Sequence, residues 1–186
     1  ALVAVEEEGD RLTEAELYGT CSLLLVAGHE TTINLIGNGT QALLQNRPQW
    51  ELLCAQPDLA KTAVEELLRY DSPVQMTSRL VMEPLTIGEQ EFLPGSFVNL
   101  MLGAANRDTA VFENPHQLDI TRKPNPHLAF GAGIHYCLGA PLARLEGQIA
   151  FTTLTRRFPN LHLTDETPQY RSNYILRGLE SLPVTF

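Results

Sequence analysis

The segment FGAGIHYCLG, residues 130–139, combines one thiol with three glycines and has the clearest potential for chemistry. A cysteine acts as a nucleophile or a metal ligand in its thiolate form. Glycine costs stability in regular structure, but it lets the backbone turn sharply or come close to another group. The placement of Gly131, Gly133 and Gly139 around Cys137 therefore predicts a loop wrapped around a bulky object that the sulfur touches.

A second candidate is the run LLLVAGHETT, in which Glu30 places a carboxylate beside the hydroxyl of Thr31. Gly28 costs a helix about 1 kcal/mol relative to alanine, and the hydroxyl of Thr31 or Thr32 can donate to the carbonyl four residues earlier, here that of Ala27 or Gly28. These features predict a bulge or kink with room for a small molecule or water. An acid and an alcohol at such a defect could relay protons. On these residues alone, a kinked core helix with a solvated glutamate is an equal alternative.

A third candidate is EELLR, which places Glu66 and Arg69 on one face of a predicted helix. Taken alone, this i, i+3 spacing is also that of an ordinary surface pair worth a few tenths of a kcal/mol.

The elements that position these groups are mostly helical. Thr13 and Glu16 form a T-x-x-E capping box, and no proline follows before Pro48, which predicts one helix from Thr13 to about Gln45. At ~1.5 Å per residue this helix is roughly 50 Å long, the length of a central helix. Its run GNGTQA matches a loose dinucleotide-binding pattern, but no strand precedes it, so that function is excluded. Further helices are predicted between prolines 48 and 57, over 58–70, and from after Cys137 to about residue 158.

The remaining segments favour short strands and irregular structure. Strands are predicted over 74–81 and 96–102, with turn signals at Pro84 and Pro94-Gly95 between them. Residues 112–129 are rich in proline and predicted to be a packed, irregular meander, and residues 161–186 to form short strands and turns. The pattern as a whole indicates a mainly α protein with small β-sheets.

Composition limits the classes of function. A net charge of −9 disfavours a nucleic-acid partner, and the longest apolar run, residues 23–27, is too short to span a membrane. Cys21, Cys54 and Cys137 form no C-x-x-C pair, which favours a reducing, cytoplasmic compartment; Cys21 and Cys54 are predicted to be helix-core thiols. The first ten residues lack Met and a signal-type segment, so neither a secretion signal nor a natural N-terminus is predicted there.

Taken in order, the three motifs resemble the C-terminal half of a bacterial cytochrome P450 of the soluble, class I-like type, from about Thr13 to the end. AGHETT is similar to the oxygen-activation segment of that family's I helix, and EELLR to the E-x-x-R of its K helix. FGAGIHYCLG fits F-x-x-G-x-H-x-C-x-G, the haem-ligand loop, at every fixed position. The resemblance implies that residues 1–186 are the C-terminal haem-binding portion of a cytochrome P450 fold.

The same resemblance implies a haem b cofactor whose iron takes the Cys137 thiolate, which favours O–O cleavage, with Glu30 and Thr31 as catalytic proton donors. Arg79 and His135 would pair with the haem propionates. Glu66, Arg69 and Arg122 would form a buried structural network. The implied cofactor-binding residues are Ala27, Arg79, Phe130, Gly131, His135, Cys137 and Gly139. The implied substrate-pocket residues, each of which could equally be plain core, are Leu23, Val26, Gln75, Met76, Tyr174 and Ile175.

The implied activity is that of a haem-thiolate monooxygenase, or its catalytic half. It would use O₂ to hydroxylate or epoxidise a small apolar organic substrate, with electrons from a ferredoxin or flavodoxin and its reductase. Arg144 and Lys123 are candidates for the docking surface. Complete members are roughly twice as long, so the N-terminal half would be a further partner, and without it the long helix should expose apolar surface. The alternative is a non-catalytic haem-binding or assembly fragment that works only with an N-terminal partner.

Overall fold

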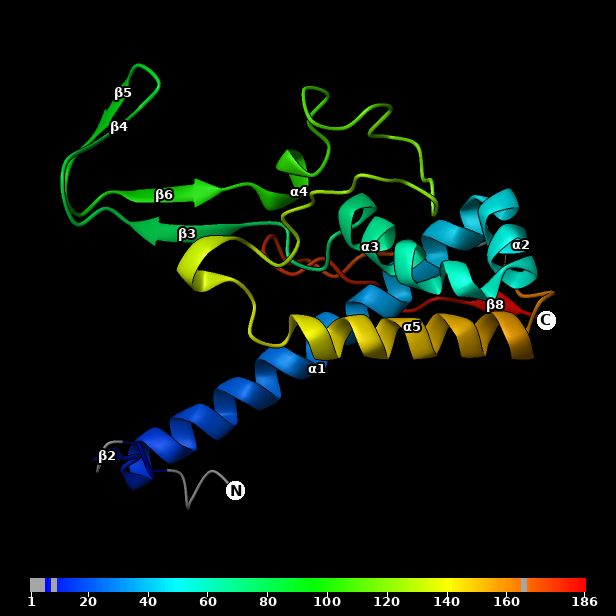
Figure 1. The fold of residues 1–186 in the computed structure, drawn as a ribbon, viewed down its shortest axis with the longest axis horizontal. Coiled ribbons are helices and arrows are strands. Elements are labelled where there is room, and N and C mark those ends of the chain that lie inside the picture. Colours follow the sequence, from blue (N-terminus) through cyan, green and yellow to red (C-terminus); the bar gives the residue numbers. More distant parts are fainter. Residues whose placement is uncertain (1–5, 8–9, 165–166) are drawn as a thin grey trace.

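The structure is a computed structural model that describes residues 6–7, 10–164 and 167–186. Residues 1–5, part of the segment predicted to carry no secretion signal, lie outside this description. The predicted mainly α architecture with small sheets is confirmed (Figure 1). No helix within the described ranges is long and apolar enough to cross a membrane. The helices are α1 (Glu14–Gln45), α2 (Arg47–Ala55), α3 (Ala60–Tyr70), α4 (Leu102–Ala105) and α5 (Ala140–Arg157), with 3-10 turns at Pro57–Leu59 and Gly133–His135.

Helix α1 begins at the predicted capping box. The Thr13 hydroxyl accepts from the Glu16 backbone N–H at 3.3 Å, and the Glu16 carboxylate accepts from the Thr13 backbone N–H at 2.8 Å. The helix then continues without interruption to Gln45. Of the two predicted threonine bonds, the one from Thr31 to the Ala27 carbonyl is present at 2.7 Å. The predicted bulge is wrong, because α1 is α-helical at every residue of this turn.

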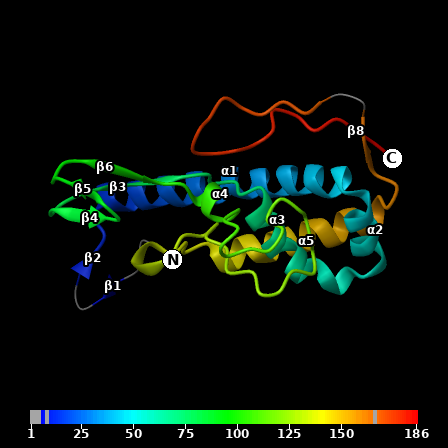
Figure 2. The same ribbon diagram turned by 90° about the horizontal axis from the view of Figure 1, so that it is seen from above.

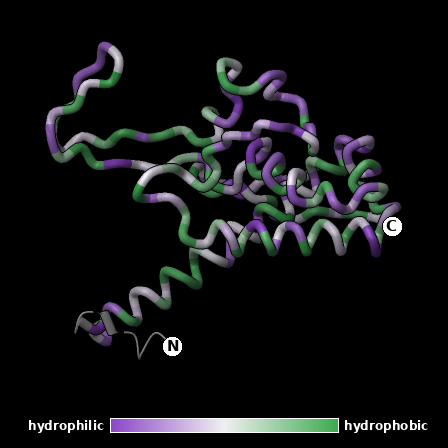
Figure 3. Tube along the Cα trace, viewed as in Figure 1, coloured by the Kyte–Doolittle hydropathy of each residue, from purple (hydrophilic) through white to green (hydrophobic). Residues whose placement is uncertain are grey.

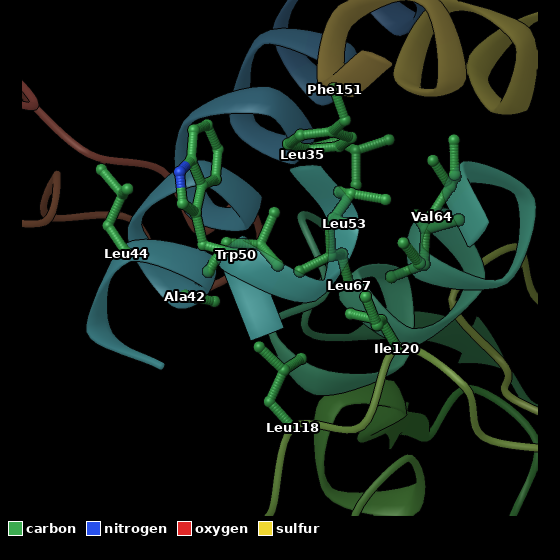
Figure 4. Close-up of a cluster of buried hydrophobic side chains, with 14 of the residues drawn as sticks. Leu35, Ala42, Leu44, Trp50, Leu53, Val64, Leu67, Leu118, Ile120 and Phe151 are labelled. Carbon is green, nitrogen blue, oxygen red and sulfur yellow. The ribbon is translucent and has the colours of Figure 1, made fainter. Parts of the chain in front are cut away.

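The core lies where the C-terminal half of α1 meets α2, α3 and α5 (Figure 4). Two glycines allow the helices to approach closely. A β-carbon on Gly39 of α1 would lie 2.6 Å from the Phe151 ring of α5, and one on Gly147 of α5 would lie 3.1 Å from Val64 of α3. Gly39, part of the rejected dinucleotide pattern, is therefore a packing residue. The labelled side chains of this core are Leu35, Ala42, Leu44, Trp50, Leu53, Val64, Leu67, Leu118, Ile120 and Phe151.

The sheets are small, two-stranded and antiparallel. They pair β1 (Glu6–Glu7) with β2 (Asp10–Arg11), β3 (Thr77–Leu80) with β6 (Phe97–Leu100), β4 (Leu85–Ile87) with β5 (Gln90–Phe92), and β7 (His162–Leu163) with β8 (Val184–Thr185). The prediction missed the β4–β5 hairpin, which turns at Gly88 with a φ of 60°, because its strands are only three residues long. Residue 102 begins α4 instead of ending a strand. Figure 2 shows the C-terminal tail along one side of α1, opposite α3 and α5.

The N-terminal half of α1 extends away from the core (Figures 1 and 3). Its apolar side chains are exposed, with Leu23 67% and Val26 66% accessible, as the sequence predicts for a helix that lacks part of its covering. Cys21 lies on this half and is exposed, so its prediction as a core thiol is wrong. Cys54 packs against the core, and its S–H donates to the Thr155 carbonyl at 3.8 Å.

Candidate functional site

The cysteine loop joins the irregular segment to α5, and its backbone places the thiol just before that helix. Gly131 and Gly133 adopt φ values of 71° and 68°, which residues with a β-carbon rarely reach. The Cys137 N–H donates to the Phe130 carbonyl at 3.0 Å, and the Cys137 carbonyl accepts from the Ala140 N–H at 3.2 Å. The half-buried Cys137 thus lies directly before the N-terminus of α5.

Two large apolar side chains close to Cys137 in the chain are exposed. Ile134 is 98% exposed and Leu138 is 88% exposed, three residues before and one residue after Cys137. Exposure of two aliphatic side chains in so short a loop is a mark of a binding surface. A broad apolar ligand that contacts the sulfur would cover both.

Arg79 and His135, the cations predicted to meet haem propionates, both have donors to spare. Arg79 lies on β3, and its guanidinium donates to Thr77 Oγ1 at 3.1 Å and to the Ser78 carbonyl at 2.9 Å. Within the described ranges, no carboxylate forms an ion pair with it. A guanidinium has five N–H donors, so Arg79 retains the capacity to bind an acidic ligand. His135 is exposed in the 3-10 turn of the cysteine loop.

The EELLR pair is buried and is the centre of a charged network. The side chains of Glu66 and Arg69 are both 0% exposed and are joined by two bonds of 2.8 Å. Arg122 Nε also donates to Glu66, at 3.1 Å, as do Asn125 Nδ2 at 3.1 Å and the Asp119 N–H at 3.0 Å. The three remaining N–H donors of Arg69 meet carbonyl oxygens, those of Asn106, Pro115 and Gln117. The network therefore fastens the irregular segment to α3 through satisfied charges.

A second charged cluster, which sequence reasoning missed, lies next to the first. Glu65 accepts two bonds from Arg144, at 2.7 and 3.0 Å, and one contact of 3.1 Å from His127 Nε2. Burial alone would raise the pKa of Glu65, but the hydrogen bonds from His127 and Arg144 and the Arg144 charge outweigh it and lower that pKa to about 2. Arg144 also donates to the Tyr136 hydroxyl at 2.9 Å. Of the two docking candidates, Arg144 is therefore paired within this chain and partly exposed, whereas Lys123 is exposed.

The proton-relay candidates lie on α1, at the border between its exposed and buried halves. The Thr31 hydroxyl donates to the Ala27 carbonyl, which leaves its lone pairs free to accept. Glu30 is partly exposed and pairs with Arg171 of the C-terminal tail at 3.4 Å. No sequence pattern links Glu30 to Arg171, because the two residues are far apart in the chain.

The predicted pocket residues separate into groups. Leu23 and Val26 are exposed on α1. The Gln75 N–H donates to the Ile175 carbonyl at 2.8 Å, so two of the predicted walls lie side by side. The side-chain amide of Gln75 donates to the Ser72 carbonyl at 2.6 Å. Gln75 also lines a polar cavity of about 230 Å³. Met76 is half-buried, and Tyr174 is almost fully exposed.

An acid, Asp71, lines that polar cavity, with 14% of its side chain exposed. Asp71 accepts from Arg177 Nε at 2.6 Å. Burial raises the pKa of Asp71 above its ordinary value despite the opposing Arg177 charge. The cavity lies between the end of α3 and the C-terminal tail, and the ion pair links these two segments.

Comparison with known protein families matches residues 40–183 to the family described as Cytochrome P450. The chain belongs to the cytochrome P450 family. It is 53% identical over 99% of its length to the polyketide biosynthesis cytochrome P450 PksS of Bacillus subtilis, covering 46% of that protein. It is 55% identical over 96% of its length to the biotin biosynthesis cytochrome P450 of the same organism, covering 45% of it. The chain therefore spans about half the length of these relatives.

Solved structures show the same relationship. The structure of PksS superposes with a TM-score of 0.96, covering 99% of this chain and 48% of that one. A structure of P450BioI, in complex with an acyl carrier protein that bears hexadec-9Z-enoic acid, superposes with a TM-score of 0.92 at 55% identity, over 96% of this chain and 47% of that one. The predicted fold, that of part of a bacterial cytochrome P450, is confirmed.

Proposed function

We propose that the intact protein is a haem-thiolate monooxygenase that inserts one atom of O₂ into an apolar organic substrate. The observation that carries this proposal is the cysteine loop: a half-buried free thiol at the N-terminus of α5, flanked by exposed Ile134 and Leu138. The three motifs lie in a chain of the cytochrome P450 family, and membership of that family implies a haem-thiolate cofactor.

The residues present fit a haem group. Cys137 would be the thiolate ligand of the iron, Ile134 and Leu138 would contact the apolar ring, and Arg79 with His135 would pair with the propionates. Phe130 and the glycines at 131 and 139 complete the loop beside the sulfur. When bound, a thiolate-ligated haem would supply the activation of O₂.

Residues of α1 would handle protons and exclude water. The carboxylate of Glu30 is partly exposed and can take a proton from solvent, and the adjacent Thr31 hydroxyl can hold a water molecule through its free lone pairs. Ala27 would face the ring beside them. Leu23 and Val26 would give the substrate an apolar wall, because their side chains are exposed on this helix. The Glu66 network would keep the irregular segment that leads into the cysteine loop fixed to α3.

The substrate class follows from the relatives as well as from these side chains. The two similar relatives are named for polyketide and biotin biosynthesis, and the similar structure of P450BioI holds an acyl carrier protein that bears hexadec-9Z-enoic acid. We infer a long, apolar acyl or polyketide-like substrate, with Met76, Tyr174 and Ile175 as further pocket residues. Electrons would come from a ferredoxin or flavodoxin with its reductase, and Lys123 is an exposed candidate for that contact.

Turnover by the haem-loaded intact protein tests the proposal. The assay measures consumption of NAD(P)H and hydroxylated product with a surrogate ferredoxin and reductase, with and without fatty acyl substrates. The expected result is a thiolate haem spectrum with substrate-dependent product. A haem spectrum without product from any acyl or polyketide substrate would instead support a haem-binding module without turnover.

A further inference from the structure

A four-residue cluster links α3 to both ends of the cysteine loop, and we call it the Glu65 clamp (Glu65, His127, Tyr136 and Arg144). Glu65 lies on α3, Arg144 on α5, and the other two members lie before Cys137 in the chain. Arg144 presents its planar guanidinium to the carboxylate through two N–H donors, at 2.7 and 3.0 Å. This two-pronged geometry fixes direction as well as distance, which a lysine ammonium cannot do.

The clamp determines the orientation of His127. Its Nδ1 accepts from the Ala129 N–H at 3.2 Å, so its Nε2 carries the proton and donates to Glu65 at 3.1 Å. The imidazole is almost completely buried, with 3% of its side chain exposed. Both of its nitrogens are thus satisfied, and the segment that enters the cysteine loop is tied to α3.

Arg144 carries the clamp to the residues beside the thiol. Its guanidinium lies 4.6 Å from the centroid of the Phe130 ring, and its NH1 donates to the Tyr136 hydroxyl at 2.9 Å. The Phe130 and Tyr136 rings contact each other edge-on, with centroids 6.4 Å apart. The Phe130 carbonyl in turn accepts the Cys137 N–H. A continuous series of contacts therefore runs from the Glu65 carboxylate to the backbone of Cys137.

We propose that Glu65 is a positioning residue for Cys137, acting through Arg144 to keep the cysteine loop in the conformation that presents a thiolate to the haem. This role rests on the proposed haem-thiolate function. It differs from that of the Glu66 network, which fastens the irregular segment and makes no contact with Tyr136 or Arg144 among the described residues. It also assigns Arg144 to the loop instead of to an electron donor.

Variants of the intact protein test this role. Glu65→Gln keeps the side-chain shape but removes the charge, and Arg144→Lys keeps the charge but removes the planar fork. Tyr136→Phe removes one hydrogen bond and is the mildest change. Glu51→Gln is the matched control. Glu51 lies on α2, outside the cysteine loop, and its exposed carboxylate accepts one hydrogen bond from Arg47, four residues earlier on the same helix.

Two readouts separate positioning from general stability. The first is made on the haem-loaded protein. It gives the fraction of reduced, carbon monoxide-bound protein that shows the thiolate Soret band instead of the band of a neutral ligand, together with the haem reduction potential. The second is hydrogen exchange at the Cys137 amide, which needs no haem. We expect Glu65→Gln and Arg144→Lys to lower the thiolate fraction, shift the potential and speed this exchange by about tenfold, the effect of losing about 1.4 kcal/mol of charge-assisted hydrogen bonding. Tyr136→Phe should move each readout in the same direction by less, and the control should match wild type.

Wild-type values for Glu65→Gln, Arg144→Lys and Tyr136→Phe in spectrum, potential and exchange would overturn the positioning role while leaving the monooxygenase proposal intact. Wild-type values of all three readouts in Arg144→Lys alone would show that only the positive charge matters, which also contradicts the proposed positioning role. Absence of the thiolate band in wild type would refute the haem-thiolate function instead. The amide exchange of the haem-free protein would still decide whether the clamp holds the loop.

Discussion

Replacing Glu66 with glutamine removes the charge that two arginines share while it keeps the size and shape of the side chain. In the native network, Glu66 accepts from Arg69 twice, from Arg122, from Asn125 and from the Asp119 N–H, and its side chain has no exposed surface. Glutamine can accept through only one oxygen, and its NH₂ would face guanidinium donors. The variant would therefore leave the fully buried Arg69 without its counter-charge.

The expected cost follows from that burial. Removing one partner of a buried ion pair costs roughly 3–5 kcal/mol, because the remaining charge stays out of water. We expect a loss of about this size in the free energy of unfolding, measured by urea titration of the intact protein with circular dichroism and haem absorbance. Both signals should shift together, since the network joins α3 to the segment that leads into the cysteine loop.

The control for this prediction is Glu51→Gln, because the Glu51 side chain is 64% exposed and its partner Arg47 is partly exposed. An exposed pair is worth less than about 1 kcal/mol, so this variant should unfold at nearly the same urea concentration as wild type. A Glu66→Gln variant that also unfolded with wild-type stability would refute the view that the network is held by its buried charge.

Three further predictions concern other parts of the chain. Thr31→Ala should lower product formed per NAD(P)H by about a hundredfold, the scale of a lost proton-transfer group, and equal coupling would show that the hydroxyl is not used. Gly39→Ala should destabilise the fold by about 1–3 kcal/mol because its methyl would overlap the Phe151 ring, whereas Gly37→Ala, whose nearest neighbour is 3.9 Å away, should stabilise it; equal effects in thermal unfolding would contradict this packing. Because the pKa of Glu65 is lowered from 4.5 to about 2, its stabilisation is complete above pH 4.5 and is lost as the pH falls toward 2. As the pH falls over that range, the free energy of unfolding measured with urea should therefore decline less in Glu65→Gln than in wild type. An equal decline in the two proteins would contradict this prediction.

Features that depend on neighbouring residues in the sequence could be predicted. The start of α1 follows from Thr13 and Glu16, whose reciprocal bonds are local, and the end of the helix follows from the proline after it. The cysteine loop could be located because its glycines and thiol lie within ten residues. The Thr31 bond to the preceding turn was predicted for the same reason, while the predicted bulge failed because a single hydroxyl bond does not displace the helical ladder.

Features that depend on distant contacts could not be predicted from one sequence. The spacing of Glu66 and Arg69 alone was compatible with a surface pair, and their buried network with Arg122 was expected only from the family resemblance. Glu65, one position earlier, looked like an ordinary helix charge, although its partners lie 62 and 79 residues along the chain. Cys21 was expected in a core, but the exposed half of α1 has no covering residues within the described chain.

The central claim is that Cys137 is the thiolate ligand of a haem iron. The most direct test is the carbon monoxide difference spectrum of the reduced, haem-loaded intact protein, compared with that of Cys137→His. We predict that wild type gives the long-wavelength Soret band that names the family and that the variant binds haem without that band. The same band in both proteins, or its absence from wild type with haem bound, would contradict the claim.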